Sequence, residues 1–327
     1  MSPRARLIAF VAAAVAGAGA LHLGWSGVLA AIVARGYQHR APNITTIEGP
    51  ERFALLGRFI AHEAAAAQAR PFLAFVGSSF TYGYPWRESA IFSYRYAERH
   101  PQAKVVNLSM LSADTTSLND WIFCSAKVNG VRFDTTFVEI PVVNEVNSLT
   151  DYRRRRLVMP GMQRFDACDL DPQGPRYLGY FLRYPYGVGW LAGLRDPDAY
   201  DKPDQMPSVV VIPENYFAGA SDFAAVERLY AARVSAMLLT ARAVSRRVVA
   251  YPAPILLTAA RAAGADAQAL RAQLDAALAA CRAVPGVTCL DPAFLYDRPA
   301  DFYNLTHLNQ RGHAEMADWL DQHAATP

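Results

Sequence analysis

The stretch Phe72-Leu-Ala-Phe-Val-Gly-Ser-Ser-Phe80 decides the fold of this chain. Its first five residues form an unbroken apolar run, which is typical of a central strand buried on both faces. Gly77 ends the run, and Ser78 and Ser79 follow at once. In an open α/β sheet ligands bind at the carboxyl ends of strands, so a serine here can present its hydroxyl to a cleft. The alternative is an ordinary turn in which serine caps the next helix.

The rest of the chain alternates between strand-like and helix-like segments. Further strands are predicted at Lys104–Leu108, Thr135–Ile140, Arg247–Tyr251 and Val287–Leu290. Helices are predicted at Pro50–Ala69, Glu88–Arg99, Ser117–Val128 and Gln310–Gln322, with apolar stripes at Phe223, Val226, Tyr230, Met237 and Val244 and at Leu270, Leu274, Leu278 and Cys281. This alternation predicts an α/β fold with a parallel sheet, and the stripes are predicted to be core faces.

Composition narrows the class of protein. The 327 residues are 52% hydrophobic and 19% charged, which is enough for one large domain or two small ones with an ample core. The net charge of +3 is too small to indicate a nucleic-acid partner, and we expect none.

Cysteine usage bears on the compartment and on metal binding. The four cysteines are Cys124, Cys168, Cys281 and Cys289, and none forms a Cys-x-x-Cys pair, so a structural zinc site is not expected. An even count suits an oxidising compartment. Cys281 and Cys289 are close enough in sequence to bridge, but three pairings are possible, and four buried free thiols are the alternative.

The N-terminal segment predicts a membrane anchor. Leu7–Ala34 is apolar and carries no formal charge apart from possible titration of His22. At about 1.5 Å per helical residue it is long enough to span a bilayer with some tilt. The alternative is a signal peptide cleaved after Ala18-Gly-Ala20. An anchor is favoured because Leu23–Ala34 would remain apolar after cleavage. Arginines on both sides of the segment leave its orientation undecided.

Residues 146–218 interrupt the βα alternation. Arg153–Arg156 form a run of four arginines, and aromatic residues, prolines and glycines fill the rest. Loops of this length are usually functional or disordered, and the aromatic content argues against disorder. One reading is a surface for an anionic polymer, lipid headgroups or a membrane partner. The other is a solvated arginine run beside a small aromatic core.

A second polar stretch, Asp301-Phe-Tyr-Asn-Leu-Thr-His-Leu-Asn-Gln-Arg-Gly-His313, lies near the C-terminus. Together with Ser79 and the asparagines between them, it resembles the SGNH (GDSL-like) hydrolase superfamily. Four blocks carry the resemblance in order: Val76–Thr81, Asn107–Ser112, Ile140–Glu145 and Asn304–Asn309. The Gly-Ser-Ser variant, the His-Leu-Asn ending and the N-terminal segment look most like the membrane-anchored DltD and AlgJ-like branch.

The resemblance implies a fold and a mechanism. The fold is a three-layer αβα sandwich with a central parallel sheet, and the chemistry is acyl transfer. Ser79 stands in the nucleophile position, and His307 would take its proton and return it to the leaving alcohol. The backbone N–H groups of Ser79 and Ser112 and the amide of Asn144 would stabilise the oxyanion. No metal and no organic cofactor is implied.

Two positions depart from the family pattern. Asn304 stands where the family usually has the aspartate that orients the histidine. An amide oxygen can still accept the Nδ1 proton of His307, but it lacks the charge that stabilises imidazolium. Asp301 is the alternative orienting group. Ser112 stands where a glycine usually donates its backbone N–H, and its side chain can narrow the oxyanion site.

These features predict a membrane-anchored, extracytoplasmic acyl esterase or O-acyltransferase with a Ser-His mechanism. Its expected substrate is an acylated cell-envelope polysaccharide, a related polymer or a small acyl ester, with an acetyl or alanyl group. A membrane-bound O-acyltransferase is the expected partner. The alternative is an inactive accessory protein with the same fold. The expected domains are an anchor at 1–36, a connector helix at 37–71 and the SGNH-like domain at 72–327.

Overall fold

The computed structural model describes residues 9–10, 12–17, 51–110, 116–155 and 220–324. Five parallel strands form one sheet in the order β2-β1-β3-β4-β5. They are β1 (Phe72–Val76), β2 (Lys104–Asn107), β3 (Phe133–Ile140), β4 (Ser245–Pro252) and β5 (Val287–Cys289). The prediction of a parallel sheet in an α/β fold is confirmed.

Strand β1 is central and fully buried, as its apolar run predicts. It pairs with β2 on one side and with β3 on the other. Phe75 lies opposite Asn107 of β2 and Phe137 of β3, and the rings of Phe75 and Phe137 stack with their centroids 4.4 Å apart. The chain therefore changes direction across the sheet between β1 and β3, which is where open α/β sheets bind ligands.

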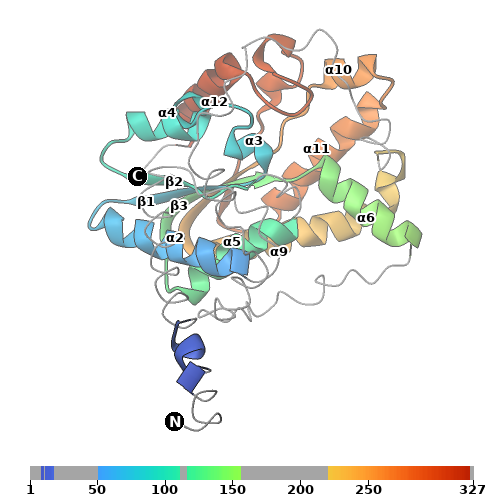
Figure 1. Ribbon diagram of the computed structural model, residues 1–327. Coiled ribbons are helices and arrows are strands. Elements are labelled where there is room, and N and C mark those ends of the chain that lie inside the picture. Colours follow the sequence, from blue (N-terminus) through green and yellow to red (C-terminus); the bar gives the residue numbers. More distant parts are fainter. Residues whose placement is uncertain (1–8, 11, 18–50, 111–115, 156–219, 325–327) are drawn as a thin grey trace.

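Helices cover both faces of the sheet (Figure 1). On one face lie α2 (Glu51–Ala67), α5 (Thr116–Val128) and α9 (Glu227–Ala243), and on the other lie α4 (Phe92–Arg99) and α12 (Gln310–His323). The remaining α-helices are α3 (Ser79–Tyr82), α6 (Val143–Arg155), α10 (Leu257–Ala262) and α11 (Ala267–Arg282). The two layers of helices enclose the sheet in an α/β sandwich.

The predicted core stripes of α9 and α11 are buried, and a disulfide closes the end of this layer. Every apolar residue that the sequence placed in the two stripes has less than a tenth of its surface exposed. A disulfide joins Cys281 of α11 to Cys289 of β5. Cys124 is also disulfide-bonded, and none of the cysteines in the described residues is free. The alternative of four free thiols is therefore wrong.

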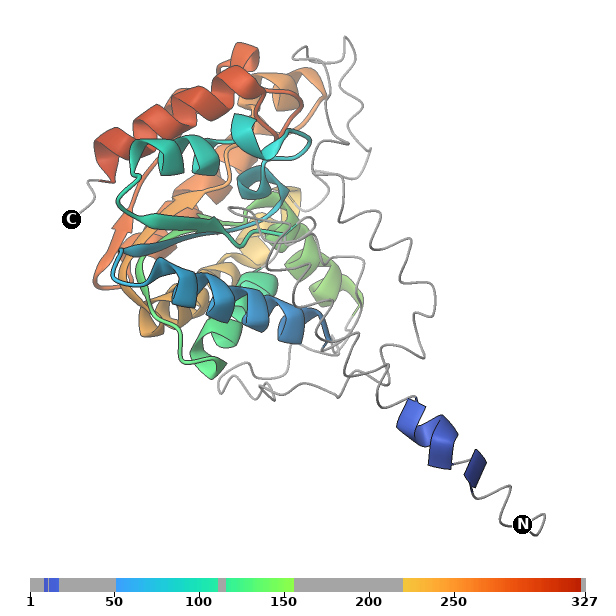
Figure 2. The ribbon, with the colours of Figure 1, turned by 60° about the vertical axis from the view of Figure 1, so that its left-hand side comes forward.

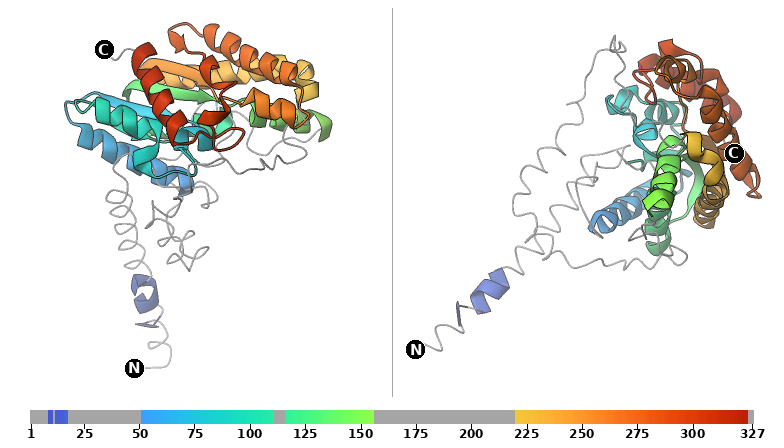
Figure 3. Two further views of the ribbon diagram at one scale, coloured as in Figure 1. Left: turned by 90° about the horizontal axis from the view of Figure 1, so that it is seen from above. Right: turned by 90° about the vertical axis from the view of Figure 1, so that its right-hand side faces the viewer.

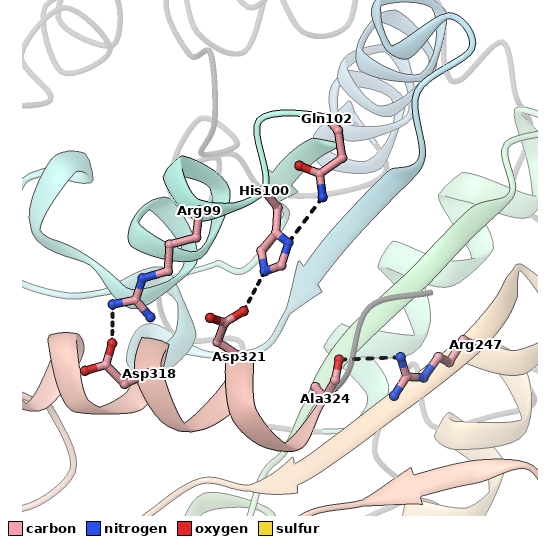
Figure 4. Close-up of polar contacts among 7 residues, drawn as sticks. All are labelled: Arg99, His100, Gln102, Arg247, Asp318, Asp321 and Ala324. Carbon is pink, nitrogen blue, oxygen red and sulfur yellow. Dashed lines mark hydrogen bonds and ion pairs between the residues drawn. The ribbon is translucent and has the colours of Figure 1, made fainter.

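The C-terminal helix α12 lies beside α4, as Figures 2 and 3 show. Arg99 forms an ion pair with Asp318, and His100 Nε2 lies 2.8 Å from Asp321 Oδ1 (Figure 4). Beyond the helix, Arg247 of β4 donates to the Ala324 carbonyl at 3.4 Å. Because α12 directly follows the loop that carries His307, these contacts also fix one end of that loop.

Two predictions need correction, one of a helix and one of the long interruption. The helix expected at Glu88–Arg99 is split into a short 3-10 turn, Glu88–Ala90, and α4, because Ile91 adopts an extended conformation between them. Helix α6 continues to Arg155, so the first part of the expected interruption at 146–218 is helical. The rest of that region, from 156, lies outside the described residues.

The anchor prediction falls mostly outside the described residues. Of Leu7–Ala34, only residues 9–10 and 12–17 are described. Within the part of the chain that the structure describes, no helix is long and apolar enough to cross a membrane.

Candidate active site

A pocket opens at the carboxyl edge of the sheet, at the β1/β3 point where the strand order changes direction. Its walls come from the turn after β1, the segments after β3 and β4, and the loop before α12. The lining residues are Ser78, Ser79, Phe80, Glu139, Pro141, Val142, Val143, Asn144, Ala253, Pro254, Ile255 and Thr306. Two predicted site residues, Ser79 and Asn144, therefore share one pocket.

Ser79 begins helix α3, which is a single turn. Ser78 is the N-cap in an extended conformation, and its Oγ accepts the backbone N–H of Phe80. Gly83 ends the helix at φ +86°, a left-handed conformation in which glycine is favoured. A Cβ on Gly83 would also collide with Ile91. The capping role proposed for serine is thus filled by Ser78, which leaves the hydroxyl of Ser79 available.

His307 lies beside Ser79, although 228 residues separate them in sequence. The Ser79 Oγ is 2.7 Å from His307 Nε2, and both side chains are partly buried. Two hydrogen bonds to its backbone carbonyls hold the histidine loop in place. Leu256, after β4, donates to the Leu305 carbonyl at 3.0 Å, and the indole N–H of Trp86 donates to the Leu308 carbonyl at 2.7 Å.

Asn304 orients the imidazole through its side-chain oxygen. The Oδ1 atom accepts the backbone N–H groups of Thr306 at 3.0 Å and His307 at 2.9 Å, so the oxygen must face the loop. The same oxygen lies 2.9 Å from His307 Nδ1. Since this oxygen carries no hydrogen, Nδ1 must carry the proton. In the neutral imidazole Nε2 is then an acceptor, and it can receive the proton of Ser79.

The imidazole is held in its neutral form. Burial lowers the pKa of His307 to about 4. The ring of Tyr84 packs edge-on against the imidazole with the centroids 5.4 Å apart, which contributes to its removal from water. No carboxylate contacts the ring among the described residues. The histidine is consequently deprotonated and able to act as a base over a wide pH range.

Asp301 does not contact His307. Its carboxylate is fully buried, and its oxygens pair with Arg298 Nε at 2.9 Å and Arg311 Nε at 2.6 Å. Its backbone carbonyl accepts the N–H of Asn309 at 2.9 Å. Of the two orienting groups that the sequence left open, Asn304 is therefore the one in contact, and Asp301 stabilises the loop.

The backbone N–H of Ser79 is available to an oxyanion. The neighbouring N–H groups in the turn are all used: Ser78 and Thr81 donate to Glu139, and Phe80 donates to Ser78. The N–H of Ser79 has no acceptor among the described residues. It sits on the nucleophile itself, as an oxyanion donor requires.

Asn144 is the second candidate oxyanion donor. It is the second residue of α6, it is partly buried, and its amide has no hydrogen-bond partner within the described part of the chain. Its neighbour Glu145 is fully buried and holds the helix in place. Glu145 accepts the Thr116 N–H at 2.9 Å and pairs with Arg233 Nε at 2.8 Å.

Two buried acids near this helix have raised pKa values. Burial is the main cause that raises the pKa of Glu145, and burial also raises the pKa of nearby Asp120 to about 7.

Ser112 lies outside the described residues, although both ends of its segment are placed. On one side, Met110 N donates to the Gly77 carbonyl at 3.1 Å. On the other, Thr116 is held by Glu145. Asn107 is buried and structural: its amide donates to the Thr81 carbonyl at 2.7 Å and to Ser93 Oγ at 2.8 Å.

Sequence reasoning missed Glu139, Thr306 and Tyr84. Glu139 was the most detectable, because it is a charged residue in the otherwise apolar end of β3, Phe137–Ile140. Thr306 and Tyr84 carry no comparable signal, since polar and aromatic residues are common in loops. Among the described residues, no group of three or more His, Cys, Asp or Glu side chains is arranged to hold a metal ion.

Comparisons with known proteins do not identify the chain. No model of a known protein family matches it, and no curated protein matches it either. The resemblance to SGNH hydrolases therefore stays a prediction, and the proposed chemistry rests on the geometry of Ser79, His307 and Asn304.

Proposed function

We propose that this protein is a serine-dependent acyl esterase or O-acyltransferase of the SGNH type. The observation that carries the proposal is the hydrogen-bonded series Ser79 Oγ, His307 Nε2, His307 Nδ1 and Asn304 Oδ1 at the edge of a pocket. A serine hydroxyl needs a correctly oriented base to become a nucleophile, and this arrangement supplies one. The same geometry weighs against an inactive accessory protein.

The reaction follows from the positions of these groups. Ser79 Oγ attacks the acyl carbonyl carbon while His307 Nε2 takes the hydroxyl proton. The N–H of Ser79 and the amide of Asn144 donate to the resulting oxyanion. When the ester bond breaks, His307 returns the proton to the leaving alcohol, and the acyl group stays on Ser79. Water or an acceptor hydroxyl then attacks the acyl carbon while its proton passes to His307 Nε2. When the bond from the acyl carbon to Ser79 Oγ breaks, His307 gives that proton to Ser79 Oγ, and the free serine and the neutral imidazole are regenerated.

The pocket favours a small, uncharged acyl group. The pocket is small, at about 40 Å³, and it is partly open to solvent. Its walls beside Ser79 are apolar, from Pro141–Val143 and Ala253–Ile255. The one charged side chain lining it among the described residues, Glu139, already accepts hydrogen bonds from Ser78 and Thr81. An acetyl group fits these walls better than a cationic alanyl group does.

The proposed substrate carries this acyl group on a hydroxyl of a cell-envelope polysaccharide or related polymer. The protein would be anchored in the cytoplasmic membrane through Leu7–Ala34 as a single-pass protein, with its globular domain on the periplasmic or extracytoplasmic side. The Cys281–Cys289 disulfide supports an oxidising compartment. A membrane-bound O-acyltransferase is the proposed partner. The full-length protein should resist extraction by alkaline carbonate, and recovery of a soluble form beginning near Leu21 would contradict the anchor.

The catalytic proposal is tested on the full-length protein in detergent. The wild type should hydrolyse a p-nitrophenyl acetate substrate and react covalently with a fluorophosphonate probe. Ser79→Ala should lose both activities, and His307→Gln should lose hydrolysis. Ser235→Ala, a serine on α9, is the control for non-specific labelling and should match the wild type. Wild-type protein that neither hydrolyses the ester nor takes the label would contradict the proposed function.

A further inference from the structure

A buried carboxylate lies directly beneath the nucleophile turn. Glu139 is the seventh residue of β3, and only 1% of its surface is exposed. Its Oε2 accepts the backbone N–H groups of Ser78 at 3.0 Å and Thr81 at 3.1 Å, and the Thr81 hydroxyl at 2.6 Å. Its Oε1 accepts the Ser78 hydroxyl. One carboxylate therefore binds the turn on both sides of Ser79.

The contacts are selective within the turn. Glu139 accepts the N–H groups of Ser78 and Thr81, and Ser78 Oγ accepts the N–H of Phe80. Only the N–H of Ser79 keeps its hydrogen without an acceptor in the described residues. A charged acceptor forms stronger hydrogen bonds than a neutral one, so this pattern also sets the orientation of the turn relative to the sheet.

Neighbouring residues pack closely around the Glu139 side chain. A Cβ on Gly77 would come within 2.6 Å of Glu139 Cβ and 2.8 Å of Thr81 Oγ1, so only glycine lets the strand end pass this close. On the far side, Tyr251 OH lies 3.1 Å from Thr81 Oγ1. Burial and the charge of Glu139 raise the pKa of Tyr251, so the phenol stays neutral and can donate a hydrogen bond.

We propose that Glu139 is the positioning residue of the nucleophile turn: it fixes the Ser79 hydroxyl against His307 and directs the Ser79 N–H to the oxyanion. Its hydrogen bonds to Ser78 and Thr81 are the route by which it acts on Ser79. The inference rests on the proposed function for its catalytic consequence, but its geometric content is independent of it.

Glu139→Gln is the sharpest test, because it keeps the size of the side chain while removing the charge and two of the four acceptor sites. The matched control is Glu63→Gln. Glu63 is also a buried carboxylate, 3% exposed and paired with Lys104, but it lies on α2 outside the pocket. The measurements are kcat and KM on p-nitrophenyl acetate, the fluorophosphonate labelling rate, thermal stability, and crystal structures of the wild type and Glu139→Gln.

We expect Glu139→Gln to lower kcat and the labelling rate by about 10- to 100-fold, since a misplacement of about 1 Å can cost this much. KM should change little, and the Ser79 Oγ to His307 Nε2 distance should lengthen in the crystal. Glu63→Gln should lower stability to a similar extent and leave kcat and labelling unchanged. Thr81→Ser, which keeps the donated hydroxyl, should retain more activity than Thr81→Val.

The proposal would be overturned by wild-type turnover and labelling in Glu139→Gln, or by an unchanged Ser79–His307 distance in its structure. A loss of turnover equal in both glutamine variants would overturn it as well, because it would reflect stability alone. If the wild type is inert but Ser79 moves away from His307 in Glu139→Gln, the proposed function fails while the positioning role stands. The two failures are therefore distinguishable.

Discussion

Asn304 presents its side-chain oxygen to His307 Nδ1 at 2.9 Å, and two backbone N–H groups fix that oxygen in place. In a serine protease, replacing the orienting aspartate by asparagine costs about 10⁴ in turnover, because the histidine takes the wrong tautomer. Here an amide flip would point an NH₂ group at the N–H groups of Thr306 and His307. The loop therefore excludes the wrong tautomer and makes a neutral orienting group workable.

The first prediction concerns Asn304, which is neutral where a carboxylate would place a negative charge beside His307. Asn304→Asp keeps the acceptor geometry and adds a carboxylate beside the imidazole, which stabilises imidazolium and raises the pKa of His307. We expect the acidic limb of the pH–rate profile to move up by about 1–3 pH units. Turnover near pH 8 should rise on the order of tenfold because the base is stronger. The measurement is kcat on p-nitrophenyl acetate as a function of pH.

Asp301→Asn is the control for that variant. It removes a carboxylate from the same loop, but one that pairs with Arg298 and Arg311. It should lower the melting temperature and leave the acidic limb at its wild-type position. An acidic limb that moves in Asp301→Asn and not in Asn304→Asp would show that Asp301, and not Asn304, acts on His307.

The second prediction is the pH range of the wild type. Because burial lowers the pKa of His307 to about 4, the imidazole stays a free base well below neutrality. Ester hydrolysis should persist from neutral pH down to about pH 4 and fall below it. An acidic limb near pH 6.5, the ordinary value for histidine, would mean that the ring is hydrated during catalysis.

The same shift gives a stability test of definite sign. The pKa of His307 in the folded protein, about 4, lies below the ordinary histidine pKa of 6.5, so between these values the unfolded chain binds the proton that the folded chain excludes. The contribution of His307 to stability is therefore lost as pH falls through this window. Acidification from about pH 7 to about pH 4.5 should therefore lower the unfolding free energy of the wild type more than that of His307→Gln, as measured by urea denaturation.

The sheet was predictable because its signals are local. The run Phe72–Val76 is apolar at every position, and a strand buried on both faces admits little else. The stripes of α9 and α11 repeat at helical spacing, so their buried faces follow from the sequence. Helix α6 was not predicted, since its sequence after Val146 is mostly polar and the helix is held by the burial of Glu145.

The site was predictable only in part. The proximity of Ser79 and His307 followed from the order of short motifs around them. The orientation of the Asn304 amide did not, because it depends on where the N–H groups of Thr306 and His307 point. Glu139 was missed for a related reason: the role of a single carboxylate in a strand becomes clear only when the donors around it are known.

The third prediction tests the close approach of the strand end. In Gly77→Ala the added methyl group would collide with Glu139 and Thr81. We expect a loss of about 1–3 kcal/mol in unfolding free energy and a large loss of turnover, because the turn that carries Ser79 must shift. Gly264→Ala is the control: its Cβ meets nothing within 4 Å, although its φ of +81° is strained for alanine. It should lose stability and keep wild-type turnover.

The fourth prediction concerns the length of the acyl chain. Because the pocket is small, at about 40 Å³, we expect the methylenes of a longer acyl chain to crowd its apolar walls. We expect kcat/KM to fall by about tenfold or more from p-nitrophenyl acetate to the hexanoate, since one methylene in such a pocket is worth about 10- to 200-fold. A flat profile across acetate, butyrate and hexanoate would show that the acyl group binds elsewhere.

The wall residue to change is Ile255, which lines the pocket and is 1% exposed. Ile255→Ala enlarges the pocket, so the ratio of hexanoate to acetate turnover should rise relative to the wild type even if total activity falls. Ile60→Ala is the matched control, because Ile60 is as deeply buried but lies on α2 and does not line the pocket. It should lower stability and leave the ratio unchanged. A ratio that rises equally in both variants would indicate general loosening of the core and would remove Ile255 from the acyl site.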